Sequence, residues 1–215
     1  MDKSDFDWDA YVKNMTLMII NMDLEKLSGN LENLVEKSYE FAKNAYEVLK
    51  KEAEKAFADI SKMPDVVEYT DDGEPYCEKF NLESQAEDYF MEQGGIIEIY
   101  NKSIDLMLIN FFVESFDGLR KKVGDKLKES GFETNSLKIL VFEPCLEDIK
   151  KVRLINNCIK HNDSKVSKDL KEIYPAEFII NEELKINQEL VYELLKITIN
   201  SVEKFTKLFN QYYKN

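Results

Sequence analysis

Apolar residues recur every three or four positions along most of this chain, which is the period of an amphipathic helix. The clearest run begins near residue 24 and continues to about residue 60. Its seam is formed by Leu24, Leu27, Leu31, Leu34, Ser38, Phe41, Ala45, Val48, Ala53 and Phe57. At 1.5 Å per residue, this run predicts a helix about 45 Å long. The seam favours packing inside an intramolecular bundle, and a coiled-coil dimer is the alternative.

Further helices are expected on both sides of this run. A first helix is predicted from Asp9 to about Met22, with Tyr11, Met15, Met18, Ile19 and Met22 on its apolar side. Two more are predicted over 82–93 and 96–130, separated by an interruption or bend at Gly94-Gly95. The second has a wide apolar face from Ile97 to Leu119, which is typical of a buried central helix. Gly131 is expected to cap its end.

The C-terminal part predicts three more helices. After a short extended or linking run over 137–142, Pro144 suits the first turn of a helix over 144–161. That helix should bury Ile149, Val152, Ile155, Cys158 and Ile159. A shorter helix over 166–173 has Ser164 or Ser167 as its N-cap. The last helix should begin at Asn187 or Gln188 and end near Tyr213, with a core face of Leu190, Leu194, Ile197, Ser201, Phe205 and Leu208.

Two segments have the pattern of small hairpins. In the acidic loop over 62–80, Val66–Tyr69 can pair with Tyr76-Cys77 around Asp72-Gly73. The six acidic residues of this loop do not follow the spacing of a calcium-binding loop, so they predict an acidic surface excursion. A second hairpin is predicted over 178–186.

These elements predict an all-α fold, a helical bundle with long antiparallel helices and one or two small β-hairpins. The scarcity of glycine (7) and proline (4) agrees, because an all-β fold needs many turns. We expect a single helical domain over 1–215, with a long-helix hairpin over 1–61, the acidic loop over 62–80 and a bundle over 81–215.

Composition and charge narrow the class of protein. A hydrophobic content of 44% with 12% aromatic residues excludes a disordered chain. The net charge of −13 is uneven, since residues 1–100 carry −14 and residues 101–215 carry +1. Residues 150–171 carry +5. The acidic whole disfavours nonspecific nucleic-acid binding, while the basic strip permits a local contact. The acidic half either supplies solubility or binds a basic partner.

The cysteines and the apolar runs bear on location. Cys77, Cys145 and Cys158 are scattered, which fits a reducing cytoplasm without a disulfide framework or a structural zinc site. The acidic N-terminus is unlike a signal peptide. The longest apolar run, Leu106–Val113, is too short to span a bilayer. We therefore expect a cytoplasmic protein with no membrane contact, no metal and no cofactor.

One polar stripe offers chemistry. Arg153, Asn157 and His161 follow i, i+4, i+8 spacing on the helix predicted over 144–161. His161 is the only histidine, and Arg153 is one of two arginines. An imidazole exchanges protons near neutral pH, and a guanidinium grips phosphate. We expect Lys150, Lys160 and Lys165 to edge a substrate groove beside them. The alternative is a solvated helix face whose end is capped by the His-Asn pair.

The C-terminal part also resembles a known family. A helix ending in Asn156-Asn-Cys-Ile-Lys-His161-Asn is followed by the segment 180–186 and by a last helix ending in Phe205-Thr-Lys-Leu-Phe209. In this order they are similar to the HEPN superfamily of prokaryotic RNases and nucleotide-binding partners. The resemblance implies a compact α-bundle, often dimeric, that cuts single-stranded RNA without metal. Many members belong to toxin–antitoxin or antiphage systems.

The family motif is matched in part. It consists of an arginine, four to six residues and a histidine, usually with a polar residue directly after the arginine. His161 takes the histidine position, Asn156 stands where the arginine is expected, and Asn157 matches the polar residue. Seven residues separate Arg153 from His161, and an ideal helix places them about 80° apart.

Two functions remain open. In an endoribonuclease, His161 would handle the proton of the 2′-hydroxyl or the leaving 5′-oxygen, Arg153 would stabilise charge on phosphorus, and Asn157 would orient one of them. A homodimer would bring two such helices together. In a non-catalytic interaction or antitoxin-type protein, the acidic first half would bind a protein partner.

Overall fold

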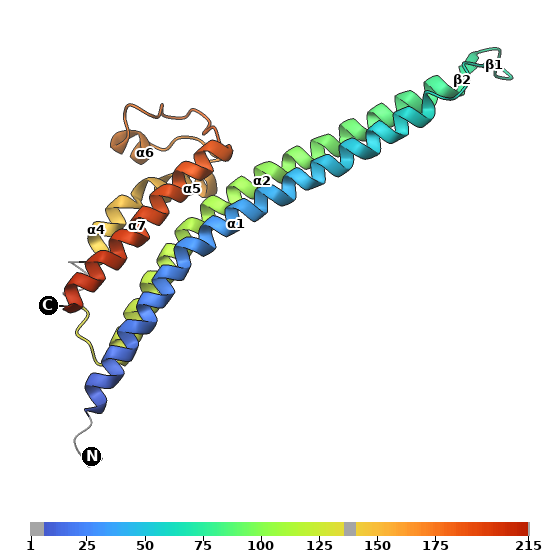
Figure 1. The fold of residues 1–215 in the computed structure, drawn as a ribbon. Helices are drawn as coiled ribbons and strands as arrows, with labels where there is room; N and C mark the ends of the chain where they lie inside the picture. Colours follow the sequence, from blue (N-terminus) through green and yellow to red (C-terminus); the bar gives the residue numbers. More distant parts are fainter. Residues whose placement is uncertain (1–6, 136–140, 215) are drawn as a thin grey trace. The chain divides into compact units, whose positions relative to one another are not determined.

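The computed structural model describes residues 7–135 and 141–214. Within these ranges the chain has six helices and a single two-stranded antiparallel sheet (Figure 1). This confirms the predicted all-α fold with a small hairpin. The chain forms two compact units: unit 1 is Met1–Val35 with Asp105–Asn215, and unit 2 is Glu36–Ile104.

Helix α1, Trp8–Ile60, is continuous, so the predicted break after Met22 is wrong. The Asp7 carboxylate caps its start by accepting a hydrogen bond from the Ala10 amide at 3.0 Å. Asp23, at the expected break, instead binds Lys122 and Lys126 with its carboxylate, at 3.0 and 2.8 Å. Because α1 contains no proline, nothing in its backbone requires an interruption.

The buried face of α1 agrees with the predicted seam at Leu24 and Leu31 but departs from it further along the helix. Ile20, Leu24, Leu31 and Val35 are buried, whereas Phe41 and Val48 of the predicted seam are 61% and 57% exposed. The predicted apolar side of the first part of α1 is exposed at Tyr11, Met18, Ile19 and Met22.

Helix α2, Glu78–Glu129, runs through Gly94-Gly95, so the interruption predicted there is wrong. Two helical glycines cost about 2 kcal/mol in all, which the packing of a 52-residue helix can offset. The predicted wide apolar face is confirmed in part. Ile104, Leu108, Phe112, Phe116 and Leu119 are buried, whereas Tyr100, Met107 and Phe111 are exposed. Gly131 caps the helix as predicted, with a φ of +73°.

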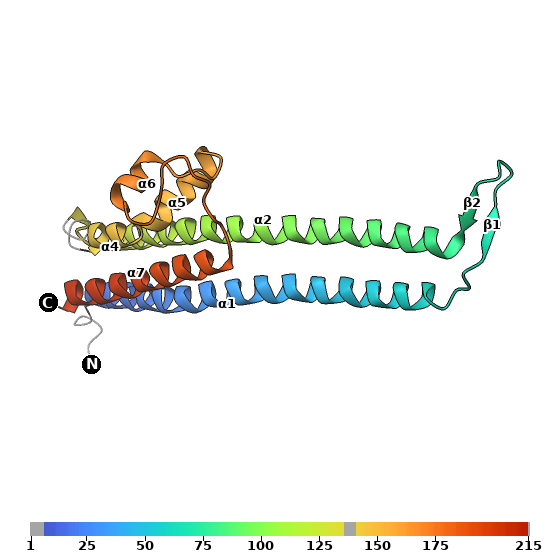
Figure 2. The ribbon, with the colours of Figure 1, turned by 90° about the horizontal axis from the view of Figure 1, so that it is seen from above.

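Unit 2 is an antiparallel pair of helical segments, 36–60 of α1 and 78–104 of α2, which run side by side (Figure 2). The strands β1 (Val67–Tyr69) and β2 (Pro75–Cys77) join them, with Val67 opposite Cys77. The predicted hairpin around Asp72-Gly73 is thus confirmed, and Gly73 has the φ of +81° that this turn requires. All of residues 36–104 are described, and Ala42 and Ile104 are the only buried apolar residues among them.

Unit 1 adds α4 (Glu143–Asp148), α5 (Lys150–His161), α6 (Lys168–Ile173) and α7 (Gln188–Lys214). Helix α7 packs along α4 and α5, and α6 packs on α5. The rings of Phe142, Phe205 and Phe209 stack in a column, with centroids 5.2 and 6.1 Å apart. Each ring buried in this way contributes about 1.5–3 kcal/mol of hydrophobic stabilisation.

The helix predicted over 144–161 is divided at Ile149, whose backbone leaves the α region (ψ 0°) while its side chain stays buried. Of its predicted core residues, Ile149, Val152, Ile155 and Cys158 are buried. The linking run over 137–142 lies largely outside the described residues, and Val141 and Phe142 form a helical turn before α4.

The hairpin predicted over 178–186 is wrong. The backbone at Lys165 pairs instead with Glu183, and Val166 donates to the Glu182 carbonyl at 2.8 Å. Asn181 turns the chain with a φ of +64°. The predicted N-cap Ser167 is confirmed, because its hydroxyl accepts a hydrogen bond from the Leu170 amide. The last helix begins at Gln188, as predicted, and the Asn187 side chain accepts from the Leu190 amide.

Candidate functional site

Helix α5 contains the predicted site residues Arg153 and His161, but their side chains lie in different environments. Arg153 lies near the start of α5, and its guanidinium forms an ion pair with Asp117 of α2. His161 is the last residue of α5 and is exposed. Eight residues of helix separate their Cα atoms by about 12 Å along the axis. Within one chain, Arg153 and His161 are therefore not brought together.

Both arginines of the protein form ion pairs with Asp117. Its Oδ1 receives the Arg153 guanidinium, and Arg120, one turn further along α2, lies 3.7 Å from the same oxygen. All three side chains are about one-third exposed. The Nε of Arg153 is buried and has no hydrogen-bond partner among the described residues. The group holds more donors than its single carboxylate can satisfy.

A polar seam continues from this group between α2 and α5. Asn156, which takes the position of the motif arginine, is 3% exposed and donates to the Asn110 side chain at 3.4 Å. Asn110 in turn donates to Glu114 at 2.9 Å, and Lys160 lies 3.8 Å from Glu114. Position 156 thus faces the interior of unit 1, where a side chain cannot meet a polymeric substrate.

The remaining predicted residues lie on the surface. Asn157 and Lys165 are exposed. Lys150, at the other end of α5 from His161, pairs with Glu147 at 3.1 Å. The predicted groove edged by Lys150, Lys160 and Lys165 is therefore not formed as one continuous rim, because Lys150 begins α5, Lys160 lies ten positions later and Lys165 follows the end of the helix.

Lys151, which sequence reasoning missed, is the most enclosed charge of α5. Its ammonium donates to Glu177 and to Glu193, the latter at 2.6 Å, and lies 5.5 Å from the centroid of the Tyr174 ring. Burial alone would lower the pKa of Lys151, but the hydrogen bonds that its ammonium donates to both glutamates, with their negative charge, outweigh burial and raise the pKa. This cluster ties α5, α7 and the segment after α6 together.

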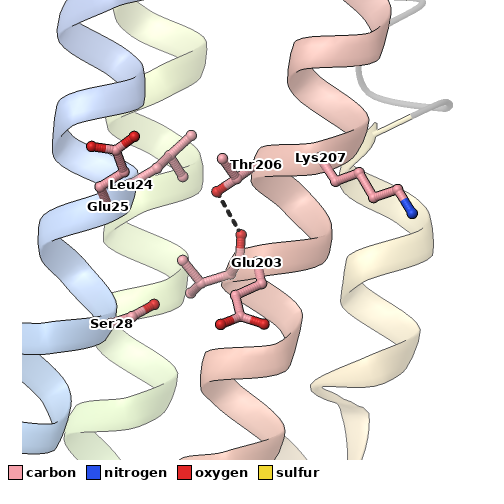
Figure 3. Close-up of a pocket in the computed structure, with 7 residues that line it drawn as sticks. Leu24, Glu25, Ser28, Glu203, Thr206 and Lys207 are labelled. Atoms are coloured by element: carbon pink, nitrogen blue, oxygen red, sulfur yellow. Dashed lines mark hydrogen bonds between the residues drawn. The ribbon is translucent and has the colours of Figure 1, made fainter.

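Two grooves of unit 1 offer space for ligands. One, of about 710 Å³, lies beside the arginine pair and is lined on α2 by Asp117, Arg120, Lys121, Gly124, Asp125 and Lys128. The other, of about 390 Å³, lies between α1 and α7 (Figure 3). In this second groove the Thr206 hydroxyl donates a hydrogen bond to the Val202 carbonyl at 2.9 Å. The Lys207 side chain extends away from Glu25 and Glu203 (Figure 3).

Unit 2 presents a different surface. It contains 17 acidic and 8 basic residues, which give it −9 of the net charge of −13. The hairpin tip, residues 62–80, exposes large apolar side chains among its carboxylates. These are Val66, Val67, Tyr69, Tyr76 and Phe80. The tip therefore combines carboxylates with exposed aromatic side chains.

Within the described ranges, no three His, Cys, Asp or Glu side chains gather as metal ligands. No helix of those ranges combines the length and apolarity needed to cross a membrane.

The seam and the arginine pair could have been found from one signal. Asn110, Glu114 and Asp117 interrupt the apolar face of α2 at spacings of four and three, and Arg153, Asn156 and Lys160 repeat spacings of three and four on α5. Two polar stripes of matching period predict facing helices. Lys151 had no such signal, because its partners come from distant segments.

Compared with known proteins, the chain matches no family model, no curated protein and no solved structure.

Proposed function

We propose that this chain is a non-catalytic, HEPN-like interaction protein whose acidic unit 2 binds a basic protein partner, as part of a toxin–antitoxin or antiphage system. The observation that carries the proposal is where Arg153 and position 156, the position of the motif arginine, lie in the structure. The Arg153 guanidinium is held by Asp117, and position 156 is buried against Asn110. Neither position offers a guanidinium to a phosphodiester beside His161.

The hairpin tip supports the choice of partner. It carries six acidic residues against Lys62 and Lys79, and Lys79 is paired with Asp65 at 2.9 Å. Exposed tyrosines and phenylalanine among carboxylates suit a basic surface with apolar patches, because aromatic side chains anchor interfaces and complementary charge steers association.

Co-purification with the products of neighbouring genes, each co-expressed with this chain, tests the proposal. The triple variant Tyr69→Ser, Tyr76→Ser, Phe80→Ser should lose a partner that wild type retains, and the complex should weaken as salt rises. The matched control is Ile179→Ser with Ile180→Ser, which removes exposed apolar side chains from unit 1. Equal retention by both variants would contradict binding through unit 2.

The exposure of Asn157 and His161 at the end of α5 favours a second candidate, a metal-independent endoribonuclease. Because one chain does not bring an arginine to His161, a second copy would have to supply the guanidinium. Cleavage of single-stranded RNA in the presence of chelator should then be lost in His161→Ala and in Arg153→Ala. Lys168→Ala, an exposed lysine on α6, is the control. Absence of cleavage by folded wild type leaves the interaction protein as the function.

A further inference from the structure

The two helical segments of unit 2 carry a line of exposed apolar residues each. On α2 the line consists of Tyr89, Ile96 and Tyr100, and on α1 it consists of Phe41 and Val48. All five side chains are exposed, from 45% at Tyr100 to 61% at Phe41. Spacings of seven and four residues return to the same side of a helix, so each line follows its helix lengthwise. These five residues are called the stripe.

The two lines of the stripe lie on the same face of the helix pair. The rings of Phe41 and Tyr100 meet edge to face, with their centroids 6.1 Å apart. The two segments are antiparallel and run side by side (Figure 2). Seven residues forward from Phe41 on α1 therefore correspond to seven residues back from Tyr100 on α2, which places Val48 between the levels of Tyr89 and Ile96. The stripe is thus one apolar surface that both helices share.

A third helix is the element that would cover such a surface. Unit 2 contains no helix besides these two segments, and Ala42 and Ile104 are the only apolar residues that it buries. A seven-residue repeat is the period at which packed helices interdigitate over a long contact. An amphipathic helix laid along the stripe would remove it from water and complete a three-helix bundle.

Charge indicates which helix fits. The α2 segment 78–104 contains six acidic and two basic residues, whereas the α1 segment 36–60 contains six acidic and five basic ones. Glu92 borders the stripe, because it lies three positions after Tyr89 and four before Ile96. A second copy of the chain would bring two units of charge −9 together, which opposes self-association through this face. The fitting occupant is an apolar-faced helix with lysine or arginine on the side toward α2.

We propose that the stripe binds a basic, amphipathic helix of a protein partner, which packs on α1 and α2 as the third helix of a bundle. The inference rests on the proposed function, which assigns a basic partner to unit 2. It adds the secondary structure of the bound segment and the surface that receives it, a surface separate from the hairpin tip.

A designed peptide tests the stripe directly. The peptide has three heptads, about 30 Å of helix, with leucine at positions a and d, lysine at e and g, and glutamine elsewhere. It should bind the full chain with a Kd of about micromolar, measured by fluorescence anisotropy, and should gain helical circular dichroism on mixing. The same peptide with glutamate at e and g should bind at least about tenfold more weakly. Equal binding of the two peptides, or binding without a gain of helix, would overturn the proposal.

Substitutions locate the bound peptide. The double variant Phe41→Gln, Ile96→Gln should weaken its binding about tenfold or more, because it removes one apolar anchor from each helix. The matched control is Tyr46→Gln with Met91→Gln, which also removes one exposed apolar side chain from each helix but off the stripe. The control should bind within about twofold of wild type. Val48→Gln alone covers the case in which the double variant unfolds, and should weaken binding about threefold or more. Equal binding by the stripe variants and the control would place the peptide elsewhere and reject the inference.

Two further measurements separate this inference from its alternatives. The tip variant Tyr69→Ser, Tyr76→Ser, Phe80→Ser should bind the peptide as wild type does. If the tip variant loses the peptide while the stripe variants retain it, the inference fails and the proposed function stands. A peptide that binds through the stripe, with no co-expressed partner that depends on unit 2, would contradict the proposed function alone. A dimer that Phe41→Gln with Ile96→Gln converts to a monomer in sedimentation would assign the stripe to a second copy and overturn the inference.

Discussion

Single residues of unit 1 show where charge contributes to stability. Lys151 is 8% exposed and is held by two glutamates and two rings, whereas its neighbour Lys150 pairs with a largely exposed Glu147. A buried charge depends on its partners, while a surface pair contributes little. The two adjacent lysines therefore form a natural comparison.

We expect Lys151→Met to lower the free energy of unfolding by about 2 kcal/mol, because it leaves Glu177 and Glu193 without their cation. Both glutamates are about half exposed, which keeps the loss below that of a fully buried pair. Lys150→Met should change the free energy of unfolding by no more than about 0.5 kcal/mol. Urea denaturation followed by circular dichroism measures both, and similar losses in the two variants would contradict the role of burial.

Stability should also fall at alkaline pH. Burial raises the pKa of the Cys145 thiol from 9.0 to about 11. Its neutral form is therefore favoured in the folded state, so this stabilisation is complete below pH 9 and is lost as pH rises toward 11. Cys145→Ala should flatten the fall in the free energy of unfolding across this window by roughly 1 kcal/mol or more. Cys77→Ala, which removes a partly exposed thiol, is the control, and an identical slope in both variants would contradict the assignment.

At this scale the sequence predicted which helix the candidate site residues share but not which residues their side chains contact. Arg153 and His161 do lie on one helix, as predicted, but the partner of Arg153 comes from α2, which the i, i+4 pattern of α5 alone does not include. Asn156 was predicted only as a departure from a motif. Its burial depends on Asn110, some forty-six positions earlier in the chain.

At the scale of elements, helical periodicity identified every long helix but misplaced the breaks. Gly94-Gly95 and Asp23 carry local signals for a helix end, yet both lie inside continuous helices. Local propensities amount to about 1 kcal/mol per residue, and packing on both sides of these positions outweighs them. The Asp72-Gly73 hairpin was predictable because its turn chemistry is local, whereas Lys165 pairs with Glu183 through contacts that no local pattern encodes.

The glycine pair gives a test of this balance. A Cβ added at Gly94 or Gly95 meets no atom within 4 Å, so neither glycine is required by a close approach. Each substitution Gly94→Ala and Gly95→Ala should raise the free energy of unfolding by about 0.5–1 kcal/mol, through the lower entropy of the unfolded chain. Gly131→Ala should act in the opposite direction, because its φ of +73° strains a residue with a side chain. A loss of stability at position 94 or 95 would mean that the helix needs a flexible point there.

At the scale of the whole molecule, the two units differ both in net charge and in how many apolar residues they bury. Unit 2 holds most of the negative charge and has a thin core, whereas unit 1 holds the buried aromatic column and the arginine pair. The charge asymmetry between the two halves was visible in the sequence. The thin core of unit 2 was not, because helical periodicity reports an apolar face without reporting whether anything covers it.

Association of two copies is the remaining prediction at this scale. Unit 1 exposes large apolar side chains such as Met18 and Phe111, and a two-fold axis near α5 would place the exposed Asn157 beside its counterpart in a second copy. Sedimentation at about tens of micromolar should then give twice the chain mass of 25.2 kDa. A disulfide needs Cβ atoms about 4 Å apart. Because the proposed axis brings the two copies of position 157 together, Asn157→Cys in a Cys77→Ser background should form an intermolecular disulfide. Lys168→Cys, on α6, is the control that should not cross-link. A monomer in sedimentation would exclude the dimer, and with it the only arrangement in which a second chain could supply an arginine to His161.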